Sequence, residues 1–264
     1  MLQAEVGDGM SVSVSASVVV ALGLLGLVGG IGITAVGPGG VLPTIGLFTL
    51  TGLSPAEVAG TAIVTHVATG VLGTAAYTRS GQLREPGTRR TAGILAGTAV
   101  LGTPVGVLLN TLVSARSFGV VLGVLVAVVA ALVWHRERHR PAAALTHPPA
   151  PVVAGLGFVV AVVSGVVGIG GPMLTVPLLV ALGVPVLESL ASAQAQSIVI
   201  AGVGTVGYLA HGAVDWPLAA LVGVPELAGV LLGWRIAHAL PARSLKYALV
   251  ITLFALAPYL ALHG

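Results

Sequence analysis

Charge is what this sequence most clearly lacks. Only 7% of its 264 residues are charged, with 11 Lys and Arg against 8 Asp and Glu. A soluble domain carries roughly 25% charged residues, and it needs them to cover its surface with groups that water solvates. This scarcity excludes an ordinary soluble domain, a disordered chain and a nucleic-acid-binding protein. Since 56% of the residues are hydrophobic, the remaining class is an all-α, polytopic membrane protein that contacts lipid.

Cysteine is absent, which excludes a disulfide framework, a thiolate metal site and a catalytic thiol. The sequence also has no HExxH, paired-Asp, GxSxG or nucleotide-binding motif. We therefore expect no enzyme activity, no catalytic residues, no metal and no cofactor. A membrane-embedded enzyme with His66, Glu226 and His238 as acid–base groups is the weaker alternative.

Apolar runs recur along the chain in two sets of five. Most are long enough to cross about 30 Å of hydrocarbon as helices. Two runs are too short for a straight crossing, and we interpret them as half-helices that follow Gly-rich breaks. The runs lie at about 12–36, 41–52, 57–78, 91–112 and 118–134, and at about 152–168, 172–183, 186–209, 217–240 and 245–262.

An internal repeat with an offset of 131 residues relates the two sets. Duplicated halves with broken helices at corresponding places are typical of secondary transporters. We expect residues 1–134 to form the first transmembrane repeat, 135–150 a cytoplasmic linker, and 151–264 the second repeat. The offset aligns Gly39 and Gly40 with Gly170 and Gly171, Thr44 with Thr175, Glu57 with Glu188, Tyr77 with Tyr208, and Pro86 with Pro217.

Positive charges indicate how the halves are oriented. They gather in the 79–90 loop, the 135–140 linker and the 235–246 region, which the positive-inside rule places in the cytoplasm. Five crossings per half satisfy all three placements and make the halves an inverted 5+5 repeat with discontinuous helices. If the short segments are re-entrant, each half has four spans and the halves are parallel. We favour inversion.

The segment 168–177, of sequence GIGGPMLTVP, resembles the sulfite exporter TauE/SafE family, also called the toluenesulfonate-uptake permease-like family. The family's hallmark, a Gly-rich break followed by an apolar run with Pro, recurs at 37–44. The resemblance extends from about 15 to 262 and includes the segments 60–62, 191–194, 208–215 and 229–233. It implies a prokaryotic inner- or plasma-membrane protein that exports sulfite, organosulfonates or related sulfur-containing anions. An anion channel, a scaffold and a carrier of an unrelated small organic anion are alternatives.

A sulfur oxyanion inside hydrocarbon needs hydrogen-bond donors and positive potential. A central Lys or Arg costs about 2.5–3.5 kcal/mol, whereas a helix N-terminus supplies about half a positive charge and free N–H groups. We expect two half-helices that begin at paired glycines to meet and form the anion site, unless those glycines serve only close packing. The candidate substrate-binding residues are Gly39, Gly40, Thr44, Thr61, His66, Gly170, Gly171, Thr175, Ser192 and Gln194.

Two ionisable residues within apolar runs are candidates for proton coupling. His66 could donate to an anion or carry a proton, or it could be a neutral histidine bonded to a neighbouring helix. Glu226 lies near mid-depth and could carry a proton, or it could pair structurally with Arg235 or His238.

Other patterns have structural interpretations. Glu57 and Glu188 are expected to stabilise the first turns of their helices, and Tyr77 and Tyr208 to anchor helix ends at the membrane interface. Small-xxx-small pairs permit close helix packing and would allow a homodimer without establishing one. These pairs are Gly26/Gly30, Gly93/Gly97, Gly102/Gly106, Gly119/Gly123 and Gly229/Gly233.

Overall fold

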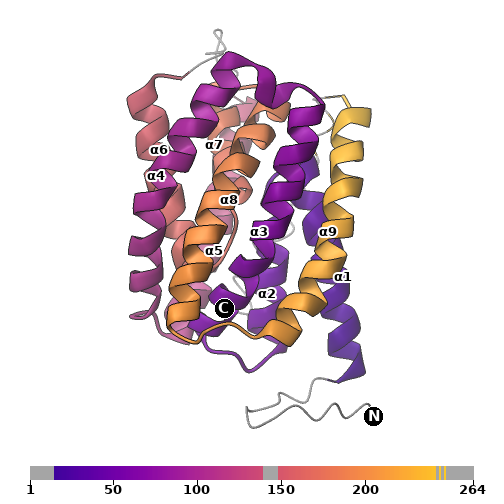
Figure 1. The fold of residues 1–264 in the computed structure, drawn as a ribbon, viewed down its shortest axis with the longest axis vertical. Helices are drawn as coiled ribbons and strands as arrows, with labels where there is room; N and C mark the ends of the chain where they lie inside the picture. The colour runs from indigo at the N-terminus through magenta and orange to yellow at the C-terminus, as the bar shows by residue number, and fades with distance from the viewer. Residues whose placement is uncertain (1–14, 139–147, 242–243, 245–246, 248–264) are drawn as a thin grey trace.

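The computed structural model describes residues 15–138, 148–241, 244 and 247, and all regular structure within them is helical (Figure 1). Six of the helices, α1, α3, α4, α6, α8 and α9, are long and apolar enough to span a membrane, which confirms the all-α membrane class. The helices are α1 (Ala16–Ala35), α2 (Val41–Leu50), α3 (Pro55–Arg79), α4 (Pro86–Asn110), α5 (Ala115–Arg138), α6 (Ala150–Val167), α7 (Pro172–Leu182), α8 (Val186–Ala210) and α9 (Trp216–Ala239), with short 3-10 helices η1 (Pro38–Gly40) and η2 (Gln82–Arg84).

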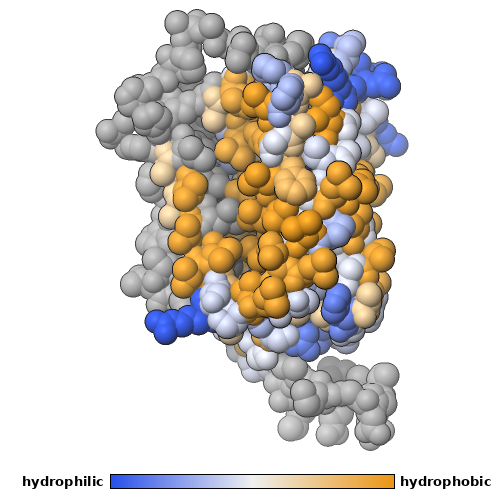
Figure 2. Space-filling view, turned by 90° about the vertical axis from the view of Figure 1, so that its left-hand side faces the viewer, coloured by the Kyte–Doolittle hydropathy of each residue, from blue (hydrophilic) through white to orange (hydrophobic). Residues whose placement is uncertain are grey.

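The surface matches a bilayer environment. Figure 2 shows apolar side chains over the middle of one face and hydrophilic ones toward its two ends. Large apolar side chains such as Leu101 and Val159 are well exposed instead of being packed inside. Such a continuous apolar surface would be a liability in water, but lipid solvates it.

The expected linker region is only partly described. α5 continues to Arg138, and α6 begins at Ala150. The intervening segment 139–147 and the run expected at 245–262 lie largely outside the described residues.

The two short helices follow sharp turns. α1 is followed by Gly37 with φ of 111°, and α6 by Gly168 with φ of 74°. A side chain at either φ would be strained, so glycine suits both turns. α2 folds back along α1, since a Cβ added at Gly46 would lie 2.7 Å from Cδ1 of Leu25.

Glycines bring α1 against α9, and α4 against α6. A Cβ added at Gly30 would collide with the carbonyl oxygen of Glu226, and one at Gly106 with that of Val162. The surroundings of the glycines are known for four of the five small-xxx-small pairs. Three of them serve packing within the chain, whereas Gly93 and Gly97 have open space around them. A homodimer stays a prediction.

α3 and α8 pack side by side in opposite directions. Near one end Gly60 of α3 lies against Tyr208 of α8, and near the other end Gly73 lies against Gln194. Both helices have 25 residues and begin at Pro55 and Val186, so their starts are 131 residues apart (186 − 55).

The prediction that Tyr77 and Tyr208 anchor an interface is wrong, because their side chains are buried. The Tyr77 hydroxyl donates to the carbonyl oxygen of Thr34 at 2.5 Å, and that of Tyr208 to Gly165 at 2.6 Å. These carbonyls lie in the last turns of α1 and α6, where no intrahelical donor follows. Each tyrosine therefore stabilises the end of a helix that precedes a turn.

The helix-start interpretation of Glu57 is confirmed. Its carboxylate accepts a hydrogen bond from the N–H of Ser54 at 2.8 Å, and its own N–H donates to the Ser54 hydroxyl at 3.3 Å. This reciprocal pair is a capping box. Glu188 also lies in a first turn, that of α8, where it accepts a hydrogen bond from the Thr88 hydroxyl at 3.4 Å.

Candidate functional site

The turn before α2 (36–40) and the turn before α7 (168–171) lie next to each other inside the bundle. We call these two turns the interruptions. A Cβ added at Gly37 would lie 2.8 Å from Cβ of Val176 and 2.9 Å from the carbonyl oxygen of Pro172. The Thr44 hydroxyl of α2 lies 3.5 Å from the carbonyl oxygen of Gly168, to which it donates a long hydrogen bond. The segment that starts α2 thus contacts the segment that starts α7.

His66 of α3 lies between these interruptions. A Cβ added at Gly40 would lie 3.1 Å from its Cε1, and one added at Gly170 would lie 3.5 Å from its Cγ. The side chain is only 1% exposed. Its Nε2 has no hydrogen-bond partner among the described residues. A buried donor or acceptor without a partner is costly, which makes this atom a candidate for ligand binding.

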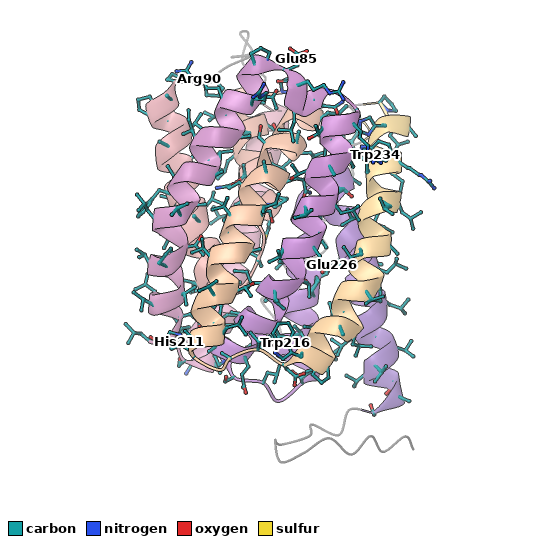
Figure 3. The ribbon with its side chains drawn as sticks, in the orientation of Figure 1. Glu85, Arg90, His211, Trp216, Glu226 and Trp234 are labelled. Carbon is teal, nitrogen blue, oxygen red and sulfur yellow. The ribbon has the colours of Figure 1, made fainter. Side chains whose placement is uncertain are left out.

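Glu226 of α9 completes the polar group around His66. One carboxylate oxygen accepts a hydrogen bond of 2.6 Å from the Thr65 hydroxyl, and the other lies 3.4 Å from Nδ1 of His66. Figure 3 shows Glu226 at mid-height of the bundle, between the two tryptophans near the ends of α9. We call Thr65, His66 and Glu226 the central cluster.

The alternative that Glu226 pairs structurally with Arg235 or His238 is wrong. His238 directs Nδ1 to the carbonyl oxygen of Trp234 at 2.9 Å, and Arg235 forms no ion pair with a described residue. Glu226 bonds across to α3 instead, because a helix turn places it on the face of α9 that meets Thr65. The 3.4 Å contact with His66 is not a hydrogen bond, because this carboxylate oxygen has no hydrogen-bond partner among the described residues.

A second polar group lies beside α7. The Thr175 hydroxyl donates to Oε1 of Gln196 at 2.5 Å, and a Cβ added at Gly171 would lie 3.0 Å from the same oxygen. Ser197 follows, and its hydroxyl would lie 2.7 Å from a Cβ added at Gly170. The structure thus brings Gly40, Gly170 and His66 together, with Gly171 and Thr175 alongside.

Sequence reasoning missed Gln196 and Ser197. The 131-residue offset could have identified both residues, since it aligns Gln196 with Thr65 and Ser197 with His66. Applying the offset to His66 alone would have identified the serine that lies beside the same glycine.

Four candidate residues contact backbone groups of neighbouring segments. Gly39 packs against α1, where an added Cβ would lie 2.5 Å from Cα of Gly32, as the packing alternative requires. The three polar candidates bind backbone groups at other positions. The Thr61 hydroxyl accepts from the N–H of Asp215 at 2.9 Å, Ser192 donates to the carbonyl of Thr88 at 3.4 Å, and Nε2 of Gln194 donates to the carbonyl of Ile33 at 3.2 Å. The Oε1 atom of Gln194 is buried and has no partner among the described residues.

A groove on the outer surface includes one residue of the central cluster, Thr65, in its wall. It encloses about 230 Å³ between α3 and α9 and is lined mainly by apolar residues. Ala68, Gly223 and Leu227 also lie in its wall. No group of three or more His, Asp or Glu suited to a metal ion occurs within the described residues.

Comparison with known proteins places the chain in a family. No curated protein and no solved structure matches the chain. A family model described as sulfite exporter TauE/SafE matches residues 22–260, and this range includes both interruptions and the central cluster. The chain therefore belongs to the sulfite exporter TauE/SafE family.

Proposed function

We propose that the protein is a secondary transporter that exports sulfite or a related sulfur oxyanion across the cell membrane by alternating access. The observation that carries the proposal is the meeting of two helix interruptions at His66. In secondary transporters, substrates bind near the midplane at interrupted helices. Family membership supports a sulfur anion as the substrate.

The proposed anion site needs no lysine or arginine. No such residue is among the buried polar residues of the described chain. The N-termini of α2 and α7 would contribute positive potential, and glycine at positions 40 and 170 would let an anion approach the backbone. His66 Nε2 and the Ser197 hydroxyl would supply side-chain donors. Thr44, Gly171 and Thr175 would support this site.

We infer that the two halves form an inverted repeat with Gly-broken helices, and that residues 1–134 and 151–264 are its units. Three relationships at the 131-residue offset support this. α2 and α7 are both short, α3 and α8 run antiparallel, and the Tyr77–Thr34 hydrogen bond has its counterpart in Tyr208–Gly165. Two similar units facing in opposite directions can rock around a shared site.

The driving force would come from the membrane potential. Moving one charge through 100 mV is worth about 2.3 kcal/mol, so an inside-negative potential favours anion efflux. His66 and Glu226 would add proton coupling, since intramembrane ionisable residues are expensive to bury and commonly functional. The contact between them gives a proton two adjacent positions.

Ligand-dependent thermal stability tests this assignment. The purified protein would be screened with sulfite, sulfate, thiosulfate, sulfoacetate, taurine and aromatic sulfonates. We expect at least one sulfur oxyanion to raise the melting temperature, and His66→Gln to reduce that shift. The same shift from unrelated carboxylates would instead favour the carrier of another organic anion. No shift from any sulfur compound would count against the site.

A further inference from the structure

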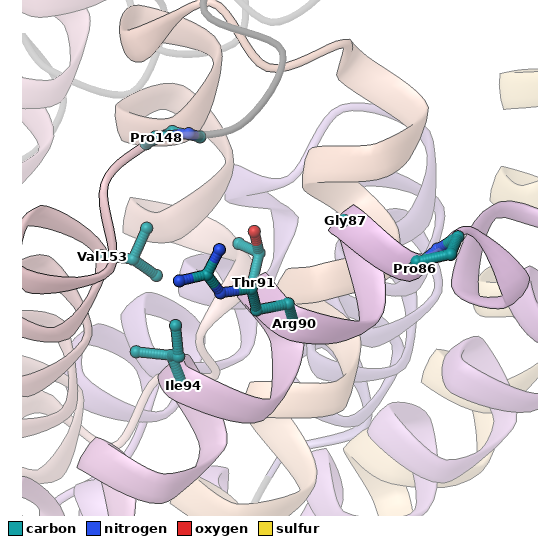
Figure 4. Close-up of a pocket in the computed structure, with 7 residues that line it drawn as sticks. All are labelled: Pro86, Gly87, Arg90, Thr91, Ile94, Pro148 and Val153. Carbon is teal, nitrogen blue, oxygen red and sulfur yellow. The ribbon is translucent and has the colours of Figure 1, made fainter.

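A separate cavity lies at the end of the bundle where α4 and α6 begin (Figure 4). It encloses about 310 Å³ and is lined by Gly87, Arg90 and Thr91 of α4 and by Pro148 and Val153 beside α6, among others. None of these residues belongs to the central cluster or to the proposed anion site.

Three groups in this cavity can bind an anion. Figure 4 shows the Arg90 guanidinium between Thr91 and Val153, and Arg90 forms no ion pair with a described residue. Thr91 is only 7% exposed, yet its hydroxyl has no hydrogen-bond partner in the described chain. The N–H of Gly87 lies in the first turn of α4, where helix geometry supplies no acceptor.

The surrounding charges favour a negatively charged ligand. α4 and α6 run in the same direction, since Leu95 contacts Gly157 and Gly106 contacts Val162 further along both helices. The positive ends of both helix dipoles therefore lie at the cavity. Two carboxylates are near the start of α4: Glu85 is exposed, and Glu188 accepts a hydrogen bond from Thr88.

The surface beyond the cavity indicates what the anion is attached to. Along α4 and α6, away from their first turns, large apolar side chains are exposed, including Leu101, Leu108 and Val159. Acyl chains can lie on such a surface, whereas a free inorganic anion gains nothing from it. An anionic phospholipid satisfies both the polar cavity and the apolar helix faces.

We propose that this cavity binds the phosphate of an anionic phospholipid headgroup, with Arg90, Thr91 and the N–H of Gly87 as its donors. The lipid would join the start of α4 to the start of α6. Because α4 belongs to the first half and α6 to the second, a bound lipid would stabilise the contact between the halves. This site is independent of the proposed transport function.

The experiment measures the melting temperature of the purified full chain in neutral detergent. Phosphatidylglycerol, phosphatidylcholine and inorganic phosphate would be titrated separately. We expect phosphatidylglycerol to raise the melting temperature and phosphatidylcholine to have little effect. Arg90→Gln should raise the phosphatidylglycerol concentration at half-effect by about tenfold, as expected for a lost charge-assisted hydrogen bond. Thr91→Val should act in the same direction, more weakly.

Arg89→Gln is the matched control, since Arg89 is exposed in the same turn and does not line the cavity. It should leave the half-effect concentration close to that of the wild type. Equal weakening by Arg89→Gln and Arg90→Gln would overturn the proposal in favour of diffuse surface attraction. An Arg90-dependent shift with inorganic phosphate alone would overturn the lipid assignment, and so would the absence of any phosphatidylglycerol effect.

Discussion

Nδ1 of His66 lies 3.4 Å from Oε1 of Glu226, and both side chains are buried between α3 and α9. The second carboxylate oxygen of Glu226 accepts a hydrogen bond from Thr65. Two adjacent residues of one helix thus hold a carboxyl group of another. Burying an ionisable pair in a membrane protein is unfavourable unless its partners compensate, which makes this contact the first target for mutation.

Glu226→Gln should separate proton coupling from folding. The amide oxygen of glutamine can still accept the hydrogen bond from Thr65, but the side chain can no longer ionise. We therefore expect the variant to fold and to transport sulfite, while its rate loses the response to a pH gradient. Flux into proteoliposomes with and without the gradient measures this.

Glu57→Gln is the control for that experiment, because Glu57 is a carboxylate at a helix start. It should keep the response of the wild type. If Glu226→Gln also kept the full response, the central cluster would have no part in proton coupling.

Gly40→Val should block transport. An added Cβ at this position already lies 3.1 Å from the His66 ring, so the larger side chain would occupy the space proposed for the anion. Gly93→Val is matched to it, since Gly93 lies on α4 with nothing within 4 Å. Sulfite flux normalised to folded protein should fall sharply for the first and little for the second. Equal rates would remove Gly40 from the site.

Gly39→Ala should have a different effect from changes at Gly40. Its added methyl would meet the backbone of α1, so we expect a loss of thermal stability and reduced yield. Residual folded protein should still bind sulfite. A stable Gly39→Ala protein that no longer binds sulfite would instead return Gly39 to the anion site.

Tyr77→Phe and Tyr208→Phe should destabilise the protein by similar amounts. Each removes the donor to a buried carbonyl oxygen at a helix end, for a cost of about 1 kcal/mol. The losses should add in the double variant, because the two sites are separate. Denaturant unfolding in detergent provides the measurement. A large effect at one tyrosine and none at the other would argue against equivalent roles.

Ser197→Ala should weaken sulfite binding about fivefold if its hydroxyl contributes one hydrogen bond to the anion. Ser192→Ala is the control on the same helix, since Ser192 donates to the backbone of Thr88 instead. A titration of the sulfite-induced melting shift compares the two variants. Weakening by Ser192→Ala alone would restore the site expected from the sequence.

The sequence was sufficient for the helical membrane class, since apolar run length and scarce charge are direct consequences of a lipid environment. It also predicted the positions of the short helices, because the glycine-containing turns before them are local features. The Tyr77 and Glu226 contacts were not predictable in this way. Both join residues far apart in the chain, and only the packing of one helix on another decides whether a polar side chain meets a partner or the interface.

The candidate site was predicted in part for the same reason. Gly40, His66 and Gly170 come together because the turns before α2 and α7 both lie beside the same residue of α3. Thr61 and Ser192 are polar residues in small-residue helices, but helix rotation directs each toward a backbone group. Gln194 also donates to a backbone group, whereas its Oε1 atom is buried without a partner among the described residues. The residue type indicates which hydrogen bonds a side chain can form. The helix face on which the residue lies determines which partner it meets.

Counterflow of labelled sulfite in proteoliposomes tests the central claim most directly. Vesicles loaded with unlabelled sulfite should accumulate labelled sulfite transiently and with a saturable rate, because a carrier with alternating access exchanges one anion for another at a single site. His66→Gln should lower that rate. Sulfite flux that never saturates would indicate a channel. Absence of flux in the folded wild-type protein would contradict the proposed export of sulfite by alternating access.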